Sequence, residues 1–312
     1  MEYRTLGKTG LEVSVMGIGT GGPSQFGQKS GVSEQEVVCL VQRGLELGIN
    51  FFDSSAGYGE SEEILGRALR GVPRDDYVLA TKFLPTREGE VTSSADVVAS
   101  VERSLTRLGV ESVDIMQFHG VKPADYPRVT ESLLPTLQKL QEQGKFRFLG
   151  LSETYAQDPC HETLPQALAD GIFDTVMVGY NMLSPGVEGL LPACREQGMG
   201  VICMVAVRKG LSRHEYLLER LEDAGKRGII ERSALPAADP LGWLVKGEVE
   251  SLPAAGYKYV AAQPAIGTVL SGTANLEHLE ANVRAILGPP LPEGDVVRLR
   301  QIFGQVQEPL GD

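Results

Sequence analysis

The chain has 312 residues, a length at which a barrel of alternating strands and helices can form one domain. Hydrophobic residues make up 42% of it and aromatic residues 6%, as in ordinary soluble proteins. Its formal net charge of -12 argues against nucleic acid or an anionic membrane as the main partner.

Cysteine usage and the N-terminal residues indicate a compartment. The four cysteines are scattered, without the paired spacing of a metal or redox motif: Cys39, Cys160, Cys194 and Cys203. We interpret them as reduced thiols of a cytoplasmic protein. Residues 1–4 do not resemble the start of a signal peptide, and no apolar run is long enough to cross a membrane. We therefore expect no membrane association.

The first 22 residues predict β-structure. Residues 3–15 are typical of two short strands joined by a glycine-flanked turn. The next residues, 16–22, predict a strand that runs into a glycine-rich loop. This loop is not a dinucleotide-binding fingerprint, because its glycines lack that spacing and no helix follows at once.

Strand and helix signals then alternate along the chain. The predicted strands cover residues 16–22, 49–52, 77–82, 113–119, 146–152, 175–180, 200–207 and 266–271. Apolar stripes at helical spacing, or helix-start signals, lie at residues 37–48, 61–65, 98–108, 133–140, 164–168, 190–196, 257–263 and 276–286. Eight such units predict a closed (β/α)8 TIM barrel, an α/β fold. An open doubly wound sheet is the alternative. No linker divides the chain, so we expect one domain over residues 1–312.

One long segment interrupts the alternation after the seventh strand. It runs from Arg208 to Leu252, and its charged part from Leu211 to Lys226 predicts a surface helix. Insertions at this end of a strand more often form a lid or a pocket wall than an independent domain.

Four polar residues lie at or shortly after the ends of three successive strands. Asp53 follows the second strand, Lys82 ends the third and His119 ends the fourth, while Tyr58 lies in the loop after Asp53. The C-terminal ends of barrel strands converge on one mouth. We therefore expect the four side chains to meet there. A bland interpretation of each residue stays open: an interior ion pair for Asp53 and Lys82, a loop aromatic for Tyr58 and a core histidine for His119.

The four residue types suit proton transfer to a carbonyl oxygen. A phenol with a pKa near ~10 is a poor acid at neutral pH unless a nearby cation lowers it. Lys82 is the candidate cation, and Asp53 would hold its ammonium group. His119 could donate a hydrogen bond to the carbonyl oxygen or steer the tyrosine proton. The set is typical of a site that protonates an oxyanion as hydride arrives from a cofactor.

Several segments together resemble the aldo-keto reductases, over nearly the whole chain. The hairpin and the strand that starts at Met16 resemble that family's N-terminus. Further matching segments are residues 50–53, 58–59, 61–66, 81–82, 117–119, 150–152, 180–183, 271–273 and 280–282. The resemblance implies a parallel barrel that binds a nicotinamide dinucleotide without a Rossmann domain. It also implies that Asp53, Tyr58, Lys82 and His119 are the catalytic residues.

The same resemblance implies cofactor contacts at seven positions: Ser152, Glu153, Met177, Gly272, Thr273, His278 and Asn282. Arg208, in the long segment after the seventh strand, is a further candidate cofactor contact, as a cation that could reach the phosphate. Ser152 would contact the nicotinamide carboxamide, and Asn282 is retained from the family pattern. Glu153 stands where the family usually has Asn, and Met177 where a Gln often lies. Gly272 and His278 fall at the usual basic pair around the adenosine 2′-phosphate. We expect NADP with only a weak preference, NAD being possible.

The resemblance favours an NAD(P)-dependent oxidoreductase acting on an aldehyde, a ketone or an aldose. The alternative is a cofactor-binding regulatory or interaction subunit with little turnover. A metal- or phosphate-dependent hydrolase finds no support, because no His/Asp cluster with metal-ligand spacing is present. We therefore expect no metal, a small carbonyl or sugar substrate and no nucleic-acid partner. The substrate itself and the oligomeric state stay open.

Overall fold

Eight parallel strands form a closed barrel in the computed structural model, which describes all 312 residues. Going round the barrel, the strand order is β10-β11-β12-β3-β4-β5-β8-β9. Their bounds are β3 Met16–Gly19, β4 Phe51–Asp53, β5 Val78–Phe83, β8 Val113–Val121, β9 Phe146–Glu153, β10 Thr175–Gly179, β11 Gly200–Met204 and β12 Ile266–Ser271. The predicted TIM barrel is confirmed.

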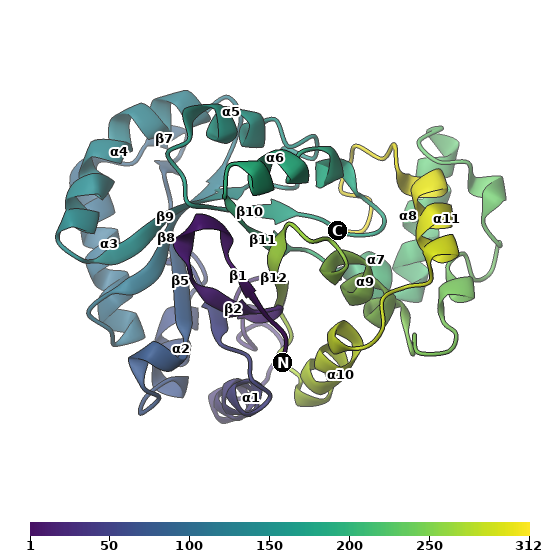
Figure 1. The fold of residues 1–312 in the computed structure, drawn as a ribbon, viewed down its shortest axis with the longest axis horizontal. Helices are drawn as coiled ribbons and strands as arrows, with labels where there is room; N and C mark the ends of the chain where they lie inside the picture. Colours follow the sequence, from purple (N-terminus) through teal and green to yellow (C-terminus); the bar gives the residue numbers. More distant parts are fainter.

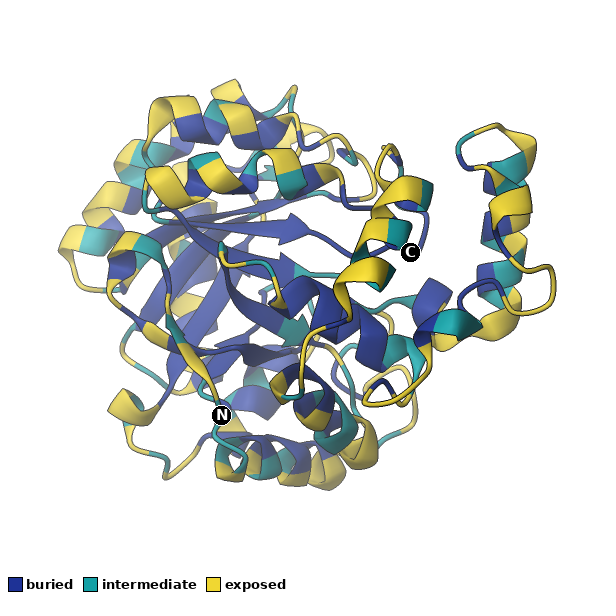
Figure 2. Ribbon diagram, turned by 45° about the vertical axis from the view of Figure 1, so that its right-hand side comes forward, coloured by how far each residue is buried: buried dark blue, intermediate teal, exposed yellow.

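Helices surround the strands (Figure 1). They are α1 Glu34–Glu46, α2 Ser61–Ala68, α3 Ser94–Leu108, α4 Tyr126–Glu142, α5 Thr163–Asp170, α6 Leu191–Glu196, α9 Leu252–Ala261 and α10 Leu276–Leu287. Figure 2 shows buried strands inside helices whose outer faces are exposed. A cluster of 72 buried residues fills the space between strands and helices.

A second, smaller core lies inside the barrel. The N-terminal hairpin, β1 Tyr3–Thr5 and β2 Glu12–Ser14, crosses one end of the barrel (Figure 1). Leu6, Leu11 and Val13 from the hairpin region pack there against inward-facing strand residues such as Phe51 and Ile115. This apolar plug closes the N-terminal end of the barrel, so polar side chains of the interior gather at the C-terminal end.

Several strand boundaries differ from the prediction, and two of them have a clear local reason. The second strand begins at Phe51 because the N–H of Ile49 bonds the carbonyl of Gly44, 2.8 Å away, and so belongs to the turn after α1. The seventh ends at Met204, not at residue 207. Val205 has φ 58, and a β-branched residue in the left-handed region breaks the extended backbone.

The long segment after β11 forms part of a flank beside the barrel. It contains α7 Lys209–Ser212 and α8 His214–Lys226, close to the predicted surface helix. The C-terminal helix α11, Glu293–Phe303, was not predicted, because only Leu299 and Phe303 of it are buried and its apolar stripe is sparse. In Figure 1, α8 and α11 lie on the same side of the barrel. Trp243 contacts α11, with the Arg298 guanidinium 4.2 Å from its ring centre.

The structure contains a further short hairpin that sequence patterns do not reveal. Its strands, β6 Thr86–Arg87 and β7 Glu90–Val91, lie between β5 and α3. No helix is both long and apolar enough to cross a bilayer.

Candidate active site

Asp53 and Lys82 form an ion pair inside the mouth of the barrel. Alternation along β4 and β5 turns them inward, on the same side as Phe51 and Ala80 of the plug. Lys82 Nζ lies 2.5 Å from Asp53 Oδ2 and 2.8 Å from the carbonyl oxygen of Ser54. Both side chains are buried, at 0% and 3% exposure. Asp53 and Lys82 therefore form an interior ion pair, and their possible role in catalysis depends on the side chains that the pair contacts.

Burial and pairing act against each other in this pair. Burial raises the pKa of Asp53, against the attraction of Lys82 and the hydrogen bonds from Lys82 and Gln117. For Lys82, burial alone would lower the pKa, but Asp53 and Tyr58 outweigh it and the net pKa is raised. Both Asp53 oxygens accept hydrogen bonds from N–H donors, which is the pattern of an ionised carboxylate beside an ammonium group.

Tyr58 and His119 stand over this ion pair. The Tyr58 hydroxyl lies 3.3 Å from His119 Nε2, and the two rings meet edge to face at 87°. Lys82 Nζ lies 5.1 Å from the centre of the Tyr58 ring. Burial, with a smaller contribution from Lys82, lowers the pKa of His119 to about 3, so the imidazole is neutral at physiological pH. The structure thus brings together the four residues predicted from the strand ends.

Gly21 lets the tyrosine ring reach this position. A Cβ atom added to Gly21 would lie 2.6 Å from two ring carbons of Tyr58 and 3.0 Å from its hydroxyl oxygen. Carbon atoms do not approach each other this closely without a shift. The loop after β3 therefore needs a residue without a side chain here.

Two polar contacts of the site were not predicted. Gln117 Nε2 donates to Asp53 Oδ1 over 3.0 Å, and Ser55 Oγ lies 2.9 Å from His119 Nδ1. Period-two alternation along β8 places Gln117 on the inward side with His119, which is a signal that could have identified it. No comparable signal exists for Ser55, because its position depends on the loop conformation between Asp53 and Tyr58.

Ser152 and Met177 are adjacent across β9 and β10, and both are buried. Met177 belongs to the small apolar core inside the barrel. Ser152 shares its inward side at the C-terminal end of β9. Ser152 is therefore placed near the mouth, whereas Met177 packs in the plug and offers no polar hydrogen-bonding group at that position.

Glu153 is directed away from the barrel interior. It follows Ser152 on β9 and so faces the helices, where its carboxylate lies 2.8 Å from His161 Nδ1. Burial raises the pKa of Glu153 in spite of this partner. The contact engages one Glu153 oxygen with His161, and the structure does not bring this side chain to the other predicted cofactor residues.

The predicted residues of the eighth unit surround the start of α10. Asn275 caps this helix by accepting the backbone N–H of His278 over 2.9 Å, while the His278 side chain is exposed. Asn282 Nδ2 donates to Ser271 Oγ over 3.1 Å and thereby fixes the end of β12. Gly272 and Thr273 form the loop between them.

Arg208 reaches toward the same region from the long segment. Its Nη1 lies 3.6 Å from where a Cβ of Gly22 would be, and a Cβ on Gly272 would find no atom nearer than the carbonyl oxygens of Gly19 and Gly21 at 3.9 Å. A guanidinium group, a helix N-terminus and an open glycine loop match the requirements of a phosphate-bearing cofactor. In the structure the Arg208 guanidinium is paired with Asp312.

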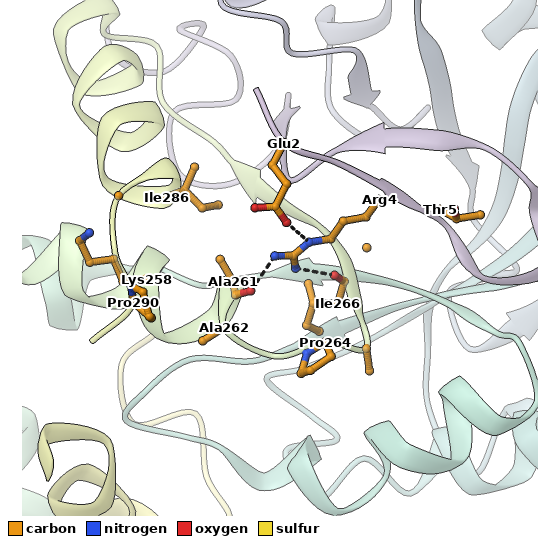
Figure 3. A pocket seen from close by; sticks show the side chains of 13 residues that line it. Glu2, Arg4, Thr5, Lys258, Ala261, Ala262, Pro264, Ile266, Ile286 and Pro290 are labelled. Carbon is orange, nitrogen blue, oxygen red and sulfur yellow. Dashed lines mark hydrogen bonds and ion pairs between the residues drawn. The ribbon is translucent and has the colours of Figure 1, made fainter. Parts of the chain in front are cut away.

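A cavity of about 610 Å³ lies elsewhere, at the N-terminal end of the barrel (Figure 3). Arg4 crosses it and donates to Glu2 over 2.7 Å and to the carbonyl oxygens of Ile266 and Ala261 over 3.0 Å each. Ile266 begins β12, so this cavity is at the end opposite the four polar residues. Because the Arg4 side chain is already bonded to the protein, we assign it a structural role.

The barrel and the four mouth residues agree with the comparison of sequences. The chain belongs to the Aldo/keto reductase family, whose sequence model matches residues 16–303. As a member it is an NAD(P)-dependent oxidoreductase of carbonyl compounds.

Individual relatives support this assignment over most of the chain. The chain is 32% identical to L-galactose dehydrogenase of Arabidopsis thaliana, over 92% of this chain and 88% of that protein. Among solved structures it is similar to the aldo-keto reductase AKR11C1 from Bacillus halodurans. The holo form gives a TM-score of 0.72 at 26% identity and covers 96% of both chains. The apo form gives 0.68 at 25% identity, covering 96% of this chain and 95% of that one.

Proposed function

We propose that Tyr58 is the general acid of carbonyl reduction and, in the reverse direction, the base of alcohol oxidation. The observation that carries this proposal is the position of its hydroxyl, 3.3 Å from Nε2 of the neutral His119 ring, with the Lys82 ammonium group 5.1 Å from the centre of the phenol ring. A cation at this distance stabilises the phenolate that remains after the proton leaves. Asp53 keeps the ammonium group in place through the 2.5 Å contact.

Each residue of the site has a separate role in proton transfer. The Tyr58 hydroxyl gives its proton to the carbonyl oxygen, and His119 orients that oxygen by a hydrogen bond from Nε2. A bound nicotinamide cofactor supplies the hydride for reduction and accepts it for oxidation. Gln117 holds the second oxygen of Asp53 and so fixes the ion pair below the phenol.

We propose NADP as the cofactor, with only a weak preference over NAD. Ser152 would contact the nicotinamide end, and Arg208, Gly272 and the start of α10 would contact the phosphates. The case for a weak preference is the charge beside α10. A 2′-phosphate requires dedicated cations, and the first turn of α10 carries the exposed His278 but no lysine or arginine. Arg208 is the nearest candidate cation that the structure brings to the loop at Gly22.

For the substrate we propose an aldose, oxidised at its C1 hydroxyl group. The support is the likeness to L-galactose dehydrogenase over most of both chains. The mouth carries the polar groups that such a reaction needs, while the loops after β3, β5 and β11 would set which sugar fits. We propose a cytoplasmic location on the grounds given by composition and the scattered cysteines.

A substrate panel tests the proposal. Aldoses would be assayed as substrates for oxidation and aldehydes and ketones for reduction, each with NAD(H) and with NADP(H). We expect turnover of at least one aldose with both cofactors. At low cofactor concentration, turnover should be faster with NADP than with NAD. Cofactor binding without turnover of any compound would contradict the proposal and favour a regulatory subunit.

A further inference from the structure

The contact between Ser55 and His119 bears on how the site keeps the tyrosine proton available. His119 is neutral, so its ring carries one proton, on either Nδ1 or Nε2. Nε2 faces the Tyr58 hydroxyl and Nδ1 faces Ser55. The position of that one proton therefore decides whether His119 donates to the reaction site or accepts from the tyrosine.

We propose that Ser55 is a positioning residue that holds His119 in the Nε2–H tautomer. Ser55 Oγ accepts the backbone N–H of Gly57 over 3.1 Å and has one hydroxyl proton to donate. Its two possible acceptors are His119 Nδ1 at 2.9 Å and the carbonyl oxygen of Lys82 at 3.4 Å. The Lys82 carbonyl already accepts the N–H of Ala56 over 3.0 Å. Donation to Nδ1 therefore gives the shorter bond and leaves no group without a partner.

The assigned tautomer has a direct consequence for proton transfer. With the proton on Nε2, His119 offers a donor toward the mouth, and the Tyr58 hydroxyl keeps its own proton for the carbonyl oxygen. In the other tautomer the Nε2 lone pair would accept the Tyr58 proton and withhold the acid from the substrate. Ser55 thus acts through His119, and this inference rests on the proposed function of Tyr58.

Neighbouring Ser54 provides a matched control. Both serines are buried at 0% exposure, but Ser54 Oγ accepts from Thr20 over 2.9 Å and does not contact His119. Ser54→Ala and Ser55→Ala each remove a buried hydroxyl group and the hydrogen bonds that it makes. Only Ser55→Ala removes the partner of Nδ1, so a change that appears in Ser55→Ala alone reports on the histidine and not on general loosening of the loop.

The test is the ¹⁵N NMR spectrum of the histidine rings in protein labelled at its four histidines, with His119 assigned by its loss in His119→Asn. We expect a pyrrole-type signal for Nε2 and a pyridine-type signal for Nδ1 in the wild type and in Ser54→Ala. In Ser55→Ala the two nitrogens should give averaged signals, or the pyrrole-type signal should belong to Nδ1 and the pyridine-type signal to Nε2. Ser55→Thr, which keeps a hydroxyl group, should restore the wild-type pattern.

Kinetics provide the second readout. With an accepted substrate and saturating cofactor, Ser55→Ala should lower kcat about three- to tenfold, as expected for one lost hydrogen bond, and Ser55→Thr should recover it. A wild-type ring protonated at Nδ1 would overturn the inference, and so would an unchanged ring in Ser55→Ala. The wild-type spectrum decides even if Ser55→Ala does not fold. Because the ring spectrum does not depend on turnover, its outcome is separate from failure of the proposed function, which the substrate panel reports.

Discussion

Adding one methyl group at Gly21 should impair catalysis without unfolding the protein. In Gly21→Ala the new Cβ would lie 2.6 Å from the Tyr58 ring, whereas carbon atoms in contact are about 3.5 Å apart or more. The ring must therefore move by about 1 Å. The Tyr58 ring is the far end of a half-buried side chain, so it can move without displacing the backbone.

A shift of that size matters because proton transfer depends on position. The Tyr58 hydroxyl lies 3.3 Å from His119 Nε2, and a further 1 Å would end that contact. A misplacement of about 1 Å can lower the rate by roughly 10²-fold. We expect kcat of Gly21→Ala to fall by about this factor, while the melting temperature stays within a few degrees of the wild type.

The assay needs a glycine that tolerates a side chain as its control. Gly294, in the first turn of α11, has no atom within 4 Å of an added Cβ. Gly294→Ala should therefore keep the wild-type kcat in the same steady-state assay with saturating cofactor. If Gly21→Ala also kept a kcat within twofold of the wild type, the ring would not occupy the described position during catalysis.

Three further predictions concern charge. In Lys82→Met the buried Asp53 carboxylate loses its partner, so the free energy of unfolding in urea should fall by about 3–5 kcal/mol; a loss below 1 kcal/mol would contradict the pairing. The pKa of His119 is about 3 in the folded protein and about 6.5 when unfolded. The free energy of unfolding should therefore decrease as pH falls from about 6.5 toward 3, by up to ~1.4 kcal/mol per pH unit. His119→Asn should lack this contribution to the pH dependence, as measured by urea titrations at different pH values. His278→Arg should tighten NADP binding about tenfold and leave NAD binding unchanged in fluorescence titrations. Equal effects on the binding of both cofactors would contradict the assignment of His278 to the 2′-phosphate site.

The barrel and the central four residues could be predicted because both follow from simple periodicity. Apolar strands recur at regular intervals, and the polar residue at the end of each strand must point into one mouth. Asp53, Lys82 and His119 are of this kind, and the strand pairing from β4 through β5 to β8 brings them together. Tyr58 could be placed at the same mouth because only a short loop separates it from Asp53.

Contacts that depend on loop conformation could not be predicted. Ser55 bonds His119 only because residues 54–57 fold back over the end of β5, and nothing in their sequence specifies that path. Glu153 occupies the position after Ser152, but alternation along β9 turns it toward His161. The sparse apolar stripe of α11 is not distinguishable from that of a loop without the surface that it covers.

Replacing Tyr58 by phenylalanine tests the central claim most directly. Tyr58→Phe removes one hydroxyl group from a half-buried ring, so the fold and cofactor binding should be preserved. Single-turnover oxidation of bound NADPH by a reactive aldehyde would be followed in stopped flow, with cofactor affinity measured in parallel. We predict a rate about 10²-fold or more below the wild type at unchanged affinity. A rate close to that of the wild type would contradict the assignment of Tyr58 as the proton donor.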